Sequence, residues 1–316
     1  EYVVITNAGN AAYDFSVQTE SLQITGNTGE DIIQGGFRAD TITGAAGADQ
    51  LSGNDGADLL VAESGDASIN GGDGDDTVRF AAAVANHSND GWLANVENVV
   101  ITNTGNAAYD FGDQTEKLNI VGNSGSDTIT GGSAADTLSG GAGADLLVAA
   151  DNDALIDGGQ GIDTVRFAAN VTTGLTNAEL VNVERIEITA TGSYDFSLQS
   201  EALTLTGSNS QDTINGGTGA DSISGGEGAD KLYGNAGVDT LLGGLGTDSL
   251  VGGDGVDYLY GGDDNDVLVA QDTDGRIDGG SNTTVGGDIA QFGAGVSASN
   301  LVDADLVEIE TIQITN

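Results

Sequence analysis

The chain of 316 residues contains no cysteine, no methionine and no proline. Without cysteine, no disulfide can staple the fold, although this absence does not identify a compartment. No run of 18 apolar residues occurs, so no segment is expected to span a membrane. The N-terminus shows no basic region followed by an apolar stretch, which is the pattern of a signal peptide.

Basic and aromatic residues are also scarce. Seven Lys and Arg face 50 Asp and Glu, the formal net charge is −43, and aromatic residues make up 5% of the chain. A chain with so much self-repulsion and so little apolar surface does not collapse easily alone, so metal is expected to contribute to folding. The same charge disfavours nucleic acid and anionic membranes as partners.

Glycine is abundant, at 52 residues, and it recurs together with aspartate every nine residues. The pattern is G-G-x-G-x-D-x-U-x, where U is aliphatic, and such a period is typical of a β-solenoid. We number its positions 1 to 9, so that the aspartate is position 6 and the aliphatic residue is position 8. The plainest copies are residues 71–79, 216–224, 225–233 and 252–260.

The spacing has a physical reading. Six glycine-rich residues can turn the chain sharply, because glycine tolerates positive φ. Three residues then form a short strand, in which position 8 faces opposite to positions 7 and 9. Position 8 is therefore predicted to be core, and it is filled by Ile33, Ile42, Leu51, Leu60, Val78, Ile129, Leu138, Leu147, Val165, Ile214, Ile223, Leu232, Leu241, Leu250, Leu259 and Leu268.

Two nonapeptides are predicted to make one coil, so turns eighteen residues apart stack on the same edge. Hard cations take six to eight oxygen ligands, and stacked carbonyls with carboxylates supply them. Pairs of turns that begin eighteen residues apart give ten well-formed steps, and roughly ten or more Ca²⁺ ions are expected. The steps are 26/44, 35/53, 53/71, 122/140, 140/158, 207/225, 225/243, 243/261, 216/234 and 234/252.

These repeats resemble the repeats-in-toxin (RTX) family of secreted proteins, found in bacterial surface-layer proteins and large adhesins, often with type I secretion. The resemblance implies an all-β fold, a right-handed parallel β-roll that binds Ca²⁺ in its turns. It also implies that the position-6 aspartates are the side-chain ligands: Asp31, Asp40, Asp49, Asp58, Asp76, Asp127, Asp136, Asp145, Asp163, Asp212, Asp221, Asp230, Asp239, Asp248, Asp257 and Asp266.

Some copies depart from the RTX pattern. Asn replaces the second glycine at positions 27, 54, 123 and 235, which is a mild change because Asn tolerates the left-handed region. The third glycine is replaced in four turns, which are weaker candidate sites, by Arg38, Ala134, Ser210 and Asp264.

The nonapeptides are grouped into larger repeats. A Glu after an aliphatic pair opens each unit, which gives solenoid units 1–96, 97–183 and 184–309, and residues 310–316 begin a further unit of what is expected to be a longer array. Before the aspartate turns, the nine-residue rhythm is expected to continue with Tyr13, Tyr109 and Tyr194 at position 6. The solenoid is therefore predicted to run unbroken.

One stretch in each unit breaks the calcium pattern. Residues 62–70, 149–157 and 270–278 lack an aspartate at position 6, so the ladder of ions is expected to thin there. The strands just before them carry apolar residues on both sides of position 8, as in Leu59-Leu60-Val61. Those outward pairs predict either a self-association surface or a face covered by the stretches 81–95, 168–182 and 293–307.

Nothing in the sequence indicates catalysis. Neither H-E-x-x-H nor G-x-S-x-G nor a phosphate-binding G-x-x-x-x-G-K-[ST] occurs. The only histidine, His87, lies with Trp92 in the stretch 81–95, which we interpret as a surface loop. The chain is therefore predicted not to be an enzyme.

The sequence favours an extracellular, calcium-rigidified structural array on a bacterial cell surface, self-associating into a surface layer, filament or adhesin stalk. An alternative is the folding and secretion domain of a larger secreted toxin or hydrolase. An ice-binding solenoid is a third class, which needs long outward rows of Thr. The row that starts at Thr41 and Thr43 is broken by Leu59 and Val61.

Overall fold

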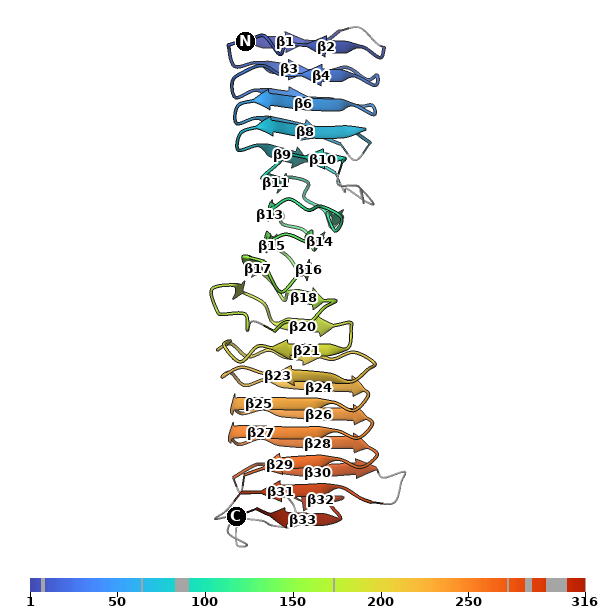
Figure 1. Cartoon of the computed structure of the whole chain (residues 1–316), viewed down its shortest axis with the longest axis vertical. Helices are drawn as coiled ribbons and strands as arrows, with labels where there is room; N and C mark the ends of the chain where they lie inside the picture. The colour runs from blue at the N-terminus through green and yellow to red at the C-terminus, as the bar shows by residue number, and fades with distance from the viewer. Residues whose placement is uncertain are drawn as a thin grey trace. The chain divides into compact units, whose positions relative to one another are not determined.

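The computed structural model describes residues 1–6, 9–63, 65–82, 91–172, 174–271, 273–281, 286–293 and 306–315. All the regular secondary structure in this part of the chain is β-strand. The strands of successive coils run parallel and stack on one another (Figure 1). The chain divides into two compact units, Glu1–Asp163 and Thr164–Asn316. The division 1–96, 97–183 and 184–309 rests on sequence repetition and stays a prediction.

The first unit holds three sheets of parallel strands. In pairing order, the first sheet contains β1 (Tyr2–Val4), β3 (Gln23–Thr25), β5 (Thr41–Thr43), β7 (Leu59–Ala62), β9 (Thr77–Phe80), β11 (Asn98–Ile101), β13 (Asn119–Val121), β15 (Thr137–Ala142) and β17 (Leu155–Gln160). The second contains β2 (Ala12–Asp14), β4 (Ile32–Gln34), β6 (Gln50–Asp55), β8 (Ser68–Asp73) and β10 (Leu93–Ala94). The third contains β12 (Ala108–Asp110), β14 (Thr128–Thr130) and β16 (Leu146–Ala149).

The second unit repeats this arrangement with two long sheets. One contains β18 (Thr164–Phe167), β20 (Arg185–Ile188), β22 (Thr204–Thr206), β24 (Ser222–Glu227), β26 (Thr240–Leu245), β28 (Tyr258–Asp263), β30 (Arg276–Ser281) and β32 (Leu306–Val307). The other contains β21 (Gly192–Asp195), β23 (Asp212–Asn215), β25 (Lys231–Gly237), β27 (Ser249–Gly255), β29 (Val267–Ala270), β31 (Ile289–Phe292) and β33 (Thr311–Ile314). The two-residue strand β19 is Leu180–Val181.

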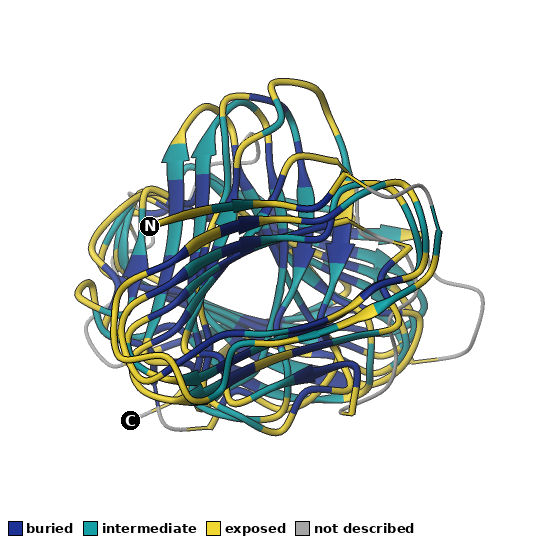
Figure 2. Cartoon of the chain, turned by 90° about the horizontal axis from the view of Figure 1, so that it is seen from above, coloured by how far each residue is buried: buried dark blue, intermediate teal, exposed yellow. Residues whose placement is uncertain are grey.

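The strand register confirms the predicted coil. Ile24 pairs with Ile42, and Ile42 pairs with Leu60, so one coil takes eighteen residues. Each position-8 side chain predicted as core is no more than 2% exposed, while its neighbours along the strand point the other way. Figure 2 shows this alternation of buried and exposed residues. The parallel β-solenoid predicted from the nine-residue period is thus the fold of both units.

The coils that carry the tyrosines are longer than eighteen residues, which corrects one prediction. Tyr109 pairs with Ile129 and Tyr194 with Ile214, a step of twenty residues. The tyrosines therefore occupy the inward position 8 and not position 6, and both of these side chains are fully buried. The sequence rhythm of nine is interrupted here, yet the stacking of strands continues.

Trp92 corrects the expectation of a surface loop. Its side chain is only 5% exposed, stacks on Phe80 with ring centroids 5.8 Å apart, and donates its indole N–H to the carbonyl of Asp66 at 2.7 Å. The next residue, Leu93, pairs with Ile69 and so extends the sheet of β8. Residues 91–95 therefore form part of a coil, whereas His87 lies outside the described residues.

The outward apolar pairs lie in the middle of sheets. Leu59 and Val61 are half-buried, and Leu59 sits between Thr41 and Thr77 on neighbouring strands. The equivalent residues of β16 and β29 are also half-buried. Their part in association stays a prediction.

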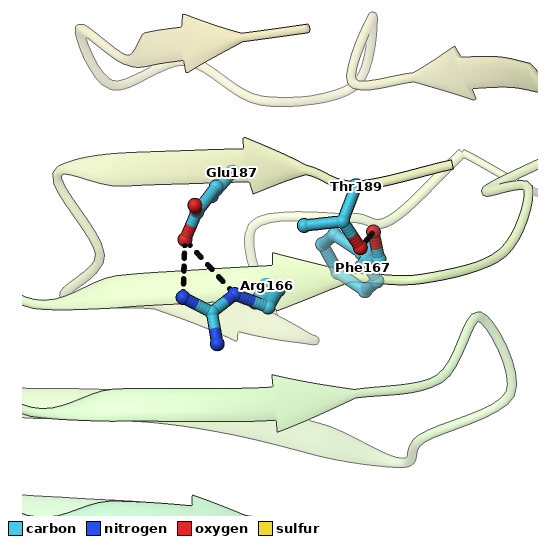
Figure 3. Close-up of polar contacts among 4 residues, drawn as sticks. All are labelled: Arg166, Phe167, Glu187 and Thr189. Carbon is cyan, nitrogen blue, oxygen red and sulfur yellow. Dashed lines mark hydrogen bonds and ion pairs between the residues drawn. The ribbon is translucent and has the colours of Figure 1, made fainter. Parts of the chain in front are cut away.

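One of the few cations ties two strands together in the second unit. Arg166 on β18 donates through Nε and Nη2 to Oε2 of Glu187 on β20, at 2.9 and 2.8 Å (Figure 3). Beyond this pair, the Thr189 hydroxyl donates to the carbonyl of Phe167 at 3.3 Å. Because both partners of the ion pair are substantially exposed, its contribution to stability is expected to be small.

Candidate metal centre

The structure buries every predicted ligand. The position-6 side chains are at most 2% exposed, and each lies directly before or at the start of a short strand. Buried carboxylates are rare in proteins unless they are paired or bind a metal. These aspartates are Asp31, Asp40, Asp49, Asp58, Asp76, Asp127, Asp136, Asp145, Asp163, Asp212, Asp221, Asp230, Asp239, Asp248, Asp257 and Asp266.

The aspartates form ladders along the edges of the coils. The backbone N–H of one aspartate donates to Oδ1 of the aspartate eighteen residues later, as in Asp40 to Asp58 and Asp58 to Asp76. Ten such bonds measure 2.7 to 2.9 Å. One carboxylate oxygen of each residue is thereby fixed by the coil before it, which orients the other oxygen.

The second oxygen, Oδ2, is buried in many of these residues and has no hydrogen-bond partner. An unsatisfied buried carboxylate oxygen is costly, and native structures contain few of them. A cation beside the oxygen removes that cost. The atoms concerned are Oδ2 of Asp49, Asp58, Asp76, Asp145, Asp230, Asp239, Asp248, Asp257 and Asp266.

The backbone beside Oδ2 leaves room that a side chain would fill. A Cβ added to Gly140, at position 1, would lie 2.5 Å from Oδ2 of Asp145 and 2.6 Å from the carbonyl oxygen of Gly158 in the next coil. Gly53, Gly225 and Gly243 have the same two neighbours at their own turns. A carboxylate oxygen and a carbonyl of the next coil thus converge on one cradle, which suits a hard cation.

Burial makes these carboxylates resist ionisation when no cation is present. It raises the pKa of Asp58 to about 7 and that of Asp145 to about 6, against the weaker opposing effect of the backbone N–H bond. Burial likewise raises the pKa of Asp248 and Asp266 to about 7. In each case a neighbouring aspartate of the same ladder adds to the shift. A divalent cation reverses this preference, because it favours the ionised form.

Family comparison agrees with this chemistry. Residues 25–60, 52–82, 119–147, 206–241 and 242–272 match the family model described as RTX calcium-binding nonapeptide repeat (4 copies). The chain carries RTX calcium-binding nonapeptide repeats. All the predicted ligands except Asp163 lie inside the matched RTX segments. No curated protein matches the chain.

The RTX turns fit calcium through scattered oxygens and not through a cluster of side chains. Within the described ranges, no group of three or more His, Cys, Asp or Glu residues is placed to hold a metal ion. The sites at Asp58, Asp145 and Asp230 each offer a bare carboxylate oxygen with a backbone carbonyl, and Ca²⁺ accepts such mixed oxygen ligands in flexible geometry. Asp58, for example, would hold an ion together with the carbonyl of Gly71.

Sequence reasoning missed three residues of the ladders, which lie in the stretches 62–70, 149–157 and 270–278, where position 6 holds no aspartate. Asp66, Asp153 and Asp274 accept the backbone N–H of Asp49, Asp136 and Asp257 at 3.3, 3.0 and 3.1 Å. They lie seventeen residues after their donors, one residue short of the usual step. In each stretch an aspartate stands at position 5, directly before the position 6 that lacks one, and this pattern could have identified the three residues in the sequence.

These three residues end a ladder and do not resemble the predicted ligands. Oδ2 of each accepts the backbone N–H of the residue three before it, from Glu63, Ala150 and Gln271, at 2.7 to 2.9 Å. Both oxygens are therefore engaged by N–H groups. The hydrogen-bond ladder thus reaches these stretches and ends in them, and whether the ions thin there stays a prediction.

Acidic residues also continue the ladders where the coils lengthen. Oε2 of Glu97 accepts the N–H of Asp76, and Oδ1 of Asp288 accepts the N–H of Asp266. Glu310 in turn accepts the N–H of Asp288. Insertions of three or four residues hide these positions from a search at a fixed spacing of eighteen.

Proposed function

We propose that this chain is an extracellular calcium-binding structural repeat protein that Ca²⁺ makes rigid. The observation that carries the proposal is the row of buried Oδ2 atoms without hydrogen-bond partners along the aspartate ladders. At Asp58, Asp145, Asp230 and Asp248, for example, a carbonyl of the adjacent coil borders the same space, so an ion bound there joins two coils. Calcium is thus a structural part of the fold, and no catalytic role is assigned.

Charge supports the same role for the metal. With a net charge of −43, the carboxylates of a metal-free chain repel one another, and the repulsion is strongest along the ladders. Each bound Ca²⁺ neutralises two charges where aspartates of successive coils are closest. Ion binding and folding are therefore coupled, and stiffness of the solenoid depends on the calcium concentration.

The repeat family supports a location outside the cell. RTX repeat proteins are typically secreted, and extracellular modules with millimolar affinity bind calcium there but not in the cytosol. No helix among the described residues is long and apolar enough to cross a membrane. We place the protein at a bacterial cell surface, in a surface layer, a filament or an adhesin stalk.

Self-association through the outer faces of the sheets completes the proposal. Leu59 and Val61 on β7, with Leu146 and Val148 on β16, project apolar side chains that are half-buried within their sheets. In the second unit, Leu242 is 44% exposed. Apolar side chains repeated on a rigid surface favour contact with copies of the same surface.

Calcium titration tests the structural role. We expect far-UV circular dichroism of a mostly disordered chain in chelator and of a β-rich chain in millimolar Ca²⁺. A spectrum unchanged by EDTA, after time for slow ion release, contradicts the proposal.

Sedimentation velocity tests association in millimolar Ca²⁺. We expect oligomers whose formation is weakened by Leu59→Ser with Leu146→Ser. Thr41→Ser with Thr128→Ser is the matched control, because Thr41 and Thr128 pair with these leucines on the same faces. A monomer at every concentration rules out self-association by this chain.

A further inference from the structure

The aspartate turns fall into two groups that the sequence pattern does not distinguish. The first turn of each ladder, called an opening turn, begins at residue 26, 35, 122, 131, 207 or 216. The turns that follow, called interior turns, begin at 44, 53, 71, 140, 158, 225, 234, 243, 252 and 261. The two groups differ in the conformation of position 2 and in the partner of Oδ2.

Position 2 of every interior turn lies in the left-handed region. Its φ ranges from 68° to 115°, in Ala45, Asn54, Gly72, Gly141, Gly159, Gly226, Asn235, Gly244, Gly253 and Gly262. None of the position-2 residues of the opening turns lies there: Asn27, Gly36, Asn123, Gly132, Ser208 and Gly217.

Residue type does not explain this difference. Ala45 adopts positive φ although an L-residue with a Cβ resists it, whereas Gly36 and Gly217 are free to adopt positive φ and do not. The place of the turn in the ladder decides its conformation. An interior turn stacks on an aspartate turn beneath it, and an opening turn stacks on a coil without one.

In the opening turns, Oδ2 is already occupied by an N–H group. The backbone N–H of position 2 donates to Oδ2 of the same turn, as from Gly36 to Asp40 at 2.6 Å and from Ser208 to Asp212 at 2.8 Å. The turns at 26, 131 and 216 do the same, and in the turn at 122 the side-chain amide of Asn123 donates instead.

Oδ1 of the opening aspartates is occupied as well. It accepts an N–H from the coil before, for example from Leu22 to Asp40 and from Gly192 to Asp212. All six opening carboxylates have this bond, at 2.7 to 3.2 Å. Both oxygens thus face N–H groups, and the positive ends of those dipoles point where a cation would bind.

We propose that the opening aspartates Asp31, Asp40, Asp127, Asp136, Asp212 and Asp221 are anchors that need no metal, and that calcium binds the interior turns only. Each ion sits beside Oδ2 of an interior aspartate, between its turn and the coil that follows, whose position-1 carbonyl borders the same cradle at Asp58, Asp145 and Asp230. This inference rests on the proposed calcium-binding function and assigns its sites residue by residue.

Asp212 and Asp230 make a matched pair for the test. They lie in consecutive coils of one ladder, the N–H of Asp212 donates to Oδ1 of Asp230, and both side chains are buried. Asn keeps the Oδ1 acceptor in either place and removes the carboxylate charge. We expect Asp230→Asn to lower the number of bound Ca²⁺ ions, measured by equilibrium dialysis with atomic absorption, by at least one per chain. We expect Asp212→Asn to leave that number unchanged while lowering the unfolding temperature in saturating Ca²⁺.

The same comparison in the first unit uses Asp40→Asn as the opening variant and Asp58→Asn as the interior variant. Loss of an ion by an opening variant, or no loss by an interior variant, overturns the inference. A full-length wild-type chain that binds no calcium instead overturns the proposed function itself, so the two failures are distinct.

A crystal structure of the unaltered chain with Ca²⁺ gives a second readout that does not depend on variants folding. We expect the N–H of Ser208 to remain on Oδ2 of Asp212 and an ion to lie beside Oδ2 of Asp230. An ion within about 2.6 Å of Oδ2 of Asp212, the distance of a calcium ligand, contradicts the inference.

Discussion

At the scale of single residues, the two carboxylate oxygens of one interior aspartate have different roles. Oδ1 of Asp239 accepts the N–H of Asp221 and so sets the spacing of two coils, whereas Oδ2 has no protein partner. In the folded coil, the bonded oxygen therefore fixes the carboxylate and leaves Oδ2 facing the cradle.

Glycine at position 1 is predicted to be required because it borders the cradle. In Gly140→Ala the new Cβ would crowd Oδ2 of Asp145 and the carbonyl of Gly158. We expect a weaker calcium site and a loss of about 1–3 kcal/mol in the free energy of unfolding in Ca²⁺. Gly105→Ala is the control, because nothing lies within 4 Å of its Cβ, and its effect should stay within about 0.5 kcal/mol. Calcium-dependent thermal unfolding measures both, and equal effects contradict the prediction.

The raised pKa values predict an unusual dependence on pH in chelator. Burial raises the pKa of Asp58, Asp248 and Asp266 to about 7, above the value of 3.8 for an exposed carboxyl. A raised pKa stabilises the fold where the group is protonated, and that stability is lost as pH rises through the folded-state pKa. The metal-free chain should therefore hold more β-structure at pH 5 than at pH 8.

Circular dichroism in EDTA across this range measures the effect, and added salt is the control. Salt screens long-range repulsion but does not remove the cost of burying a charge. If high salt at pH 8 restores as much β-structure as pH 5 does, general repulsion and not burial of the ladder aspartates is responsible.

At the scale of the coil, the sequence predicts the regular eighteen-residue coils. It does not predict the longer coils between the ladders, which we call joints. Position 8 and the step of eighteen follow from the period, because a strand of three residues buries one side chain and the turn has a fixed length. The joints have steps of other lengths, as where Val78 pairs with Val99, so no fixed period locates Tyr109 or Asp66. The predicted ligands all lie in the ladders, but the split between opening and interior turns depends on neighbours in space, which the repeat pattern does not encode.

Aromatic side chains fill these joints in the first unit. Trp92 and Phe111 both lie beside Phe80, with ring centroids 5.8 and 6.2 Å from it. This part of the core therefore packs through aromatic contacts.

Replacing Trp92 tests the joint separately from the metal sites. Trp92→Ala leaves a cavity beside Phe80, and we expect a loss of about 3–5 kcal/mol in stability at saturating Ca²⁺. Trp92→Phe keeps the aromatic contact but removes the N–H bond to the Asp66 carbonyl, so a smaller loss is expected. Thermal unfolding followed by circular dichroism gives both values. An unfolding temperature unchanged in Trp92→Ala places the side chain outside the stabilising core.

At the scale of the whole molecule, the charge of −43 and the buried carboxylates are the reasons why we expect the fold to depend on metal. Apolar burial supplies one or two apolar side chains per short strand, as Ile42 does in β5. The ladders add hydrogen-bonded N–H groups and carboxylate oxygens without a hydrogen-bond partner. Repeats of this kind need only their neighbours, so calcium at each step propagates order along the solenoid. The proposed structural array outside the cell, where calcium is abundant, is consistent with that dependence.

The number of calcium ions bound by the folded chain tests this account most directly. Native mass spectrometry of the whole protein, exchanged from millimolar Ca²⁺ into volatile buffer, counts them. The ten interior turns predict about ten ions, whose removal by chelator coincides with loss of β-structure. Fewer than about six ions, or a chain that remains folded when all are removed, would contradict the account.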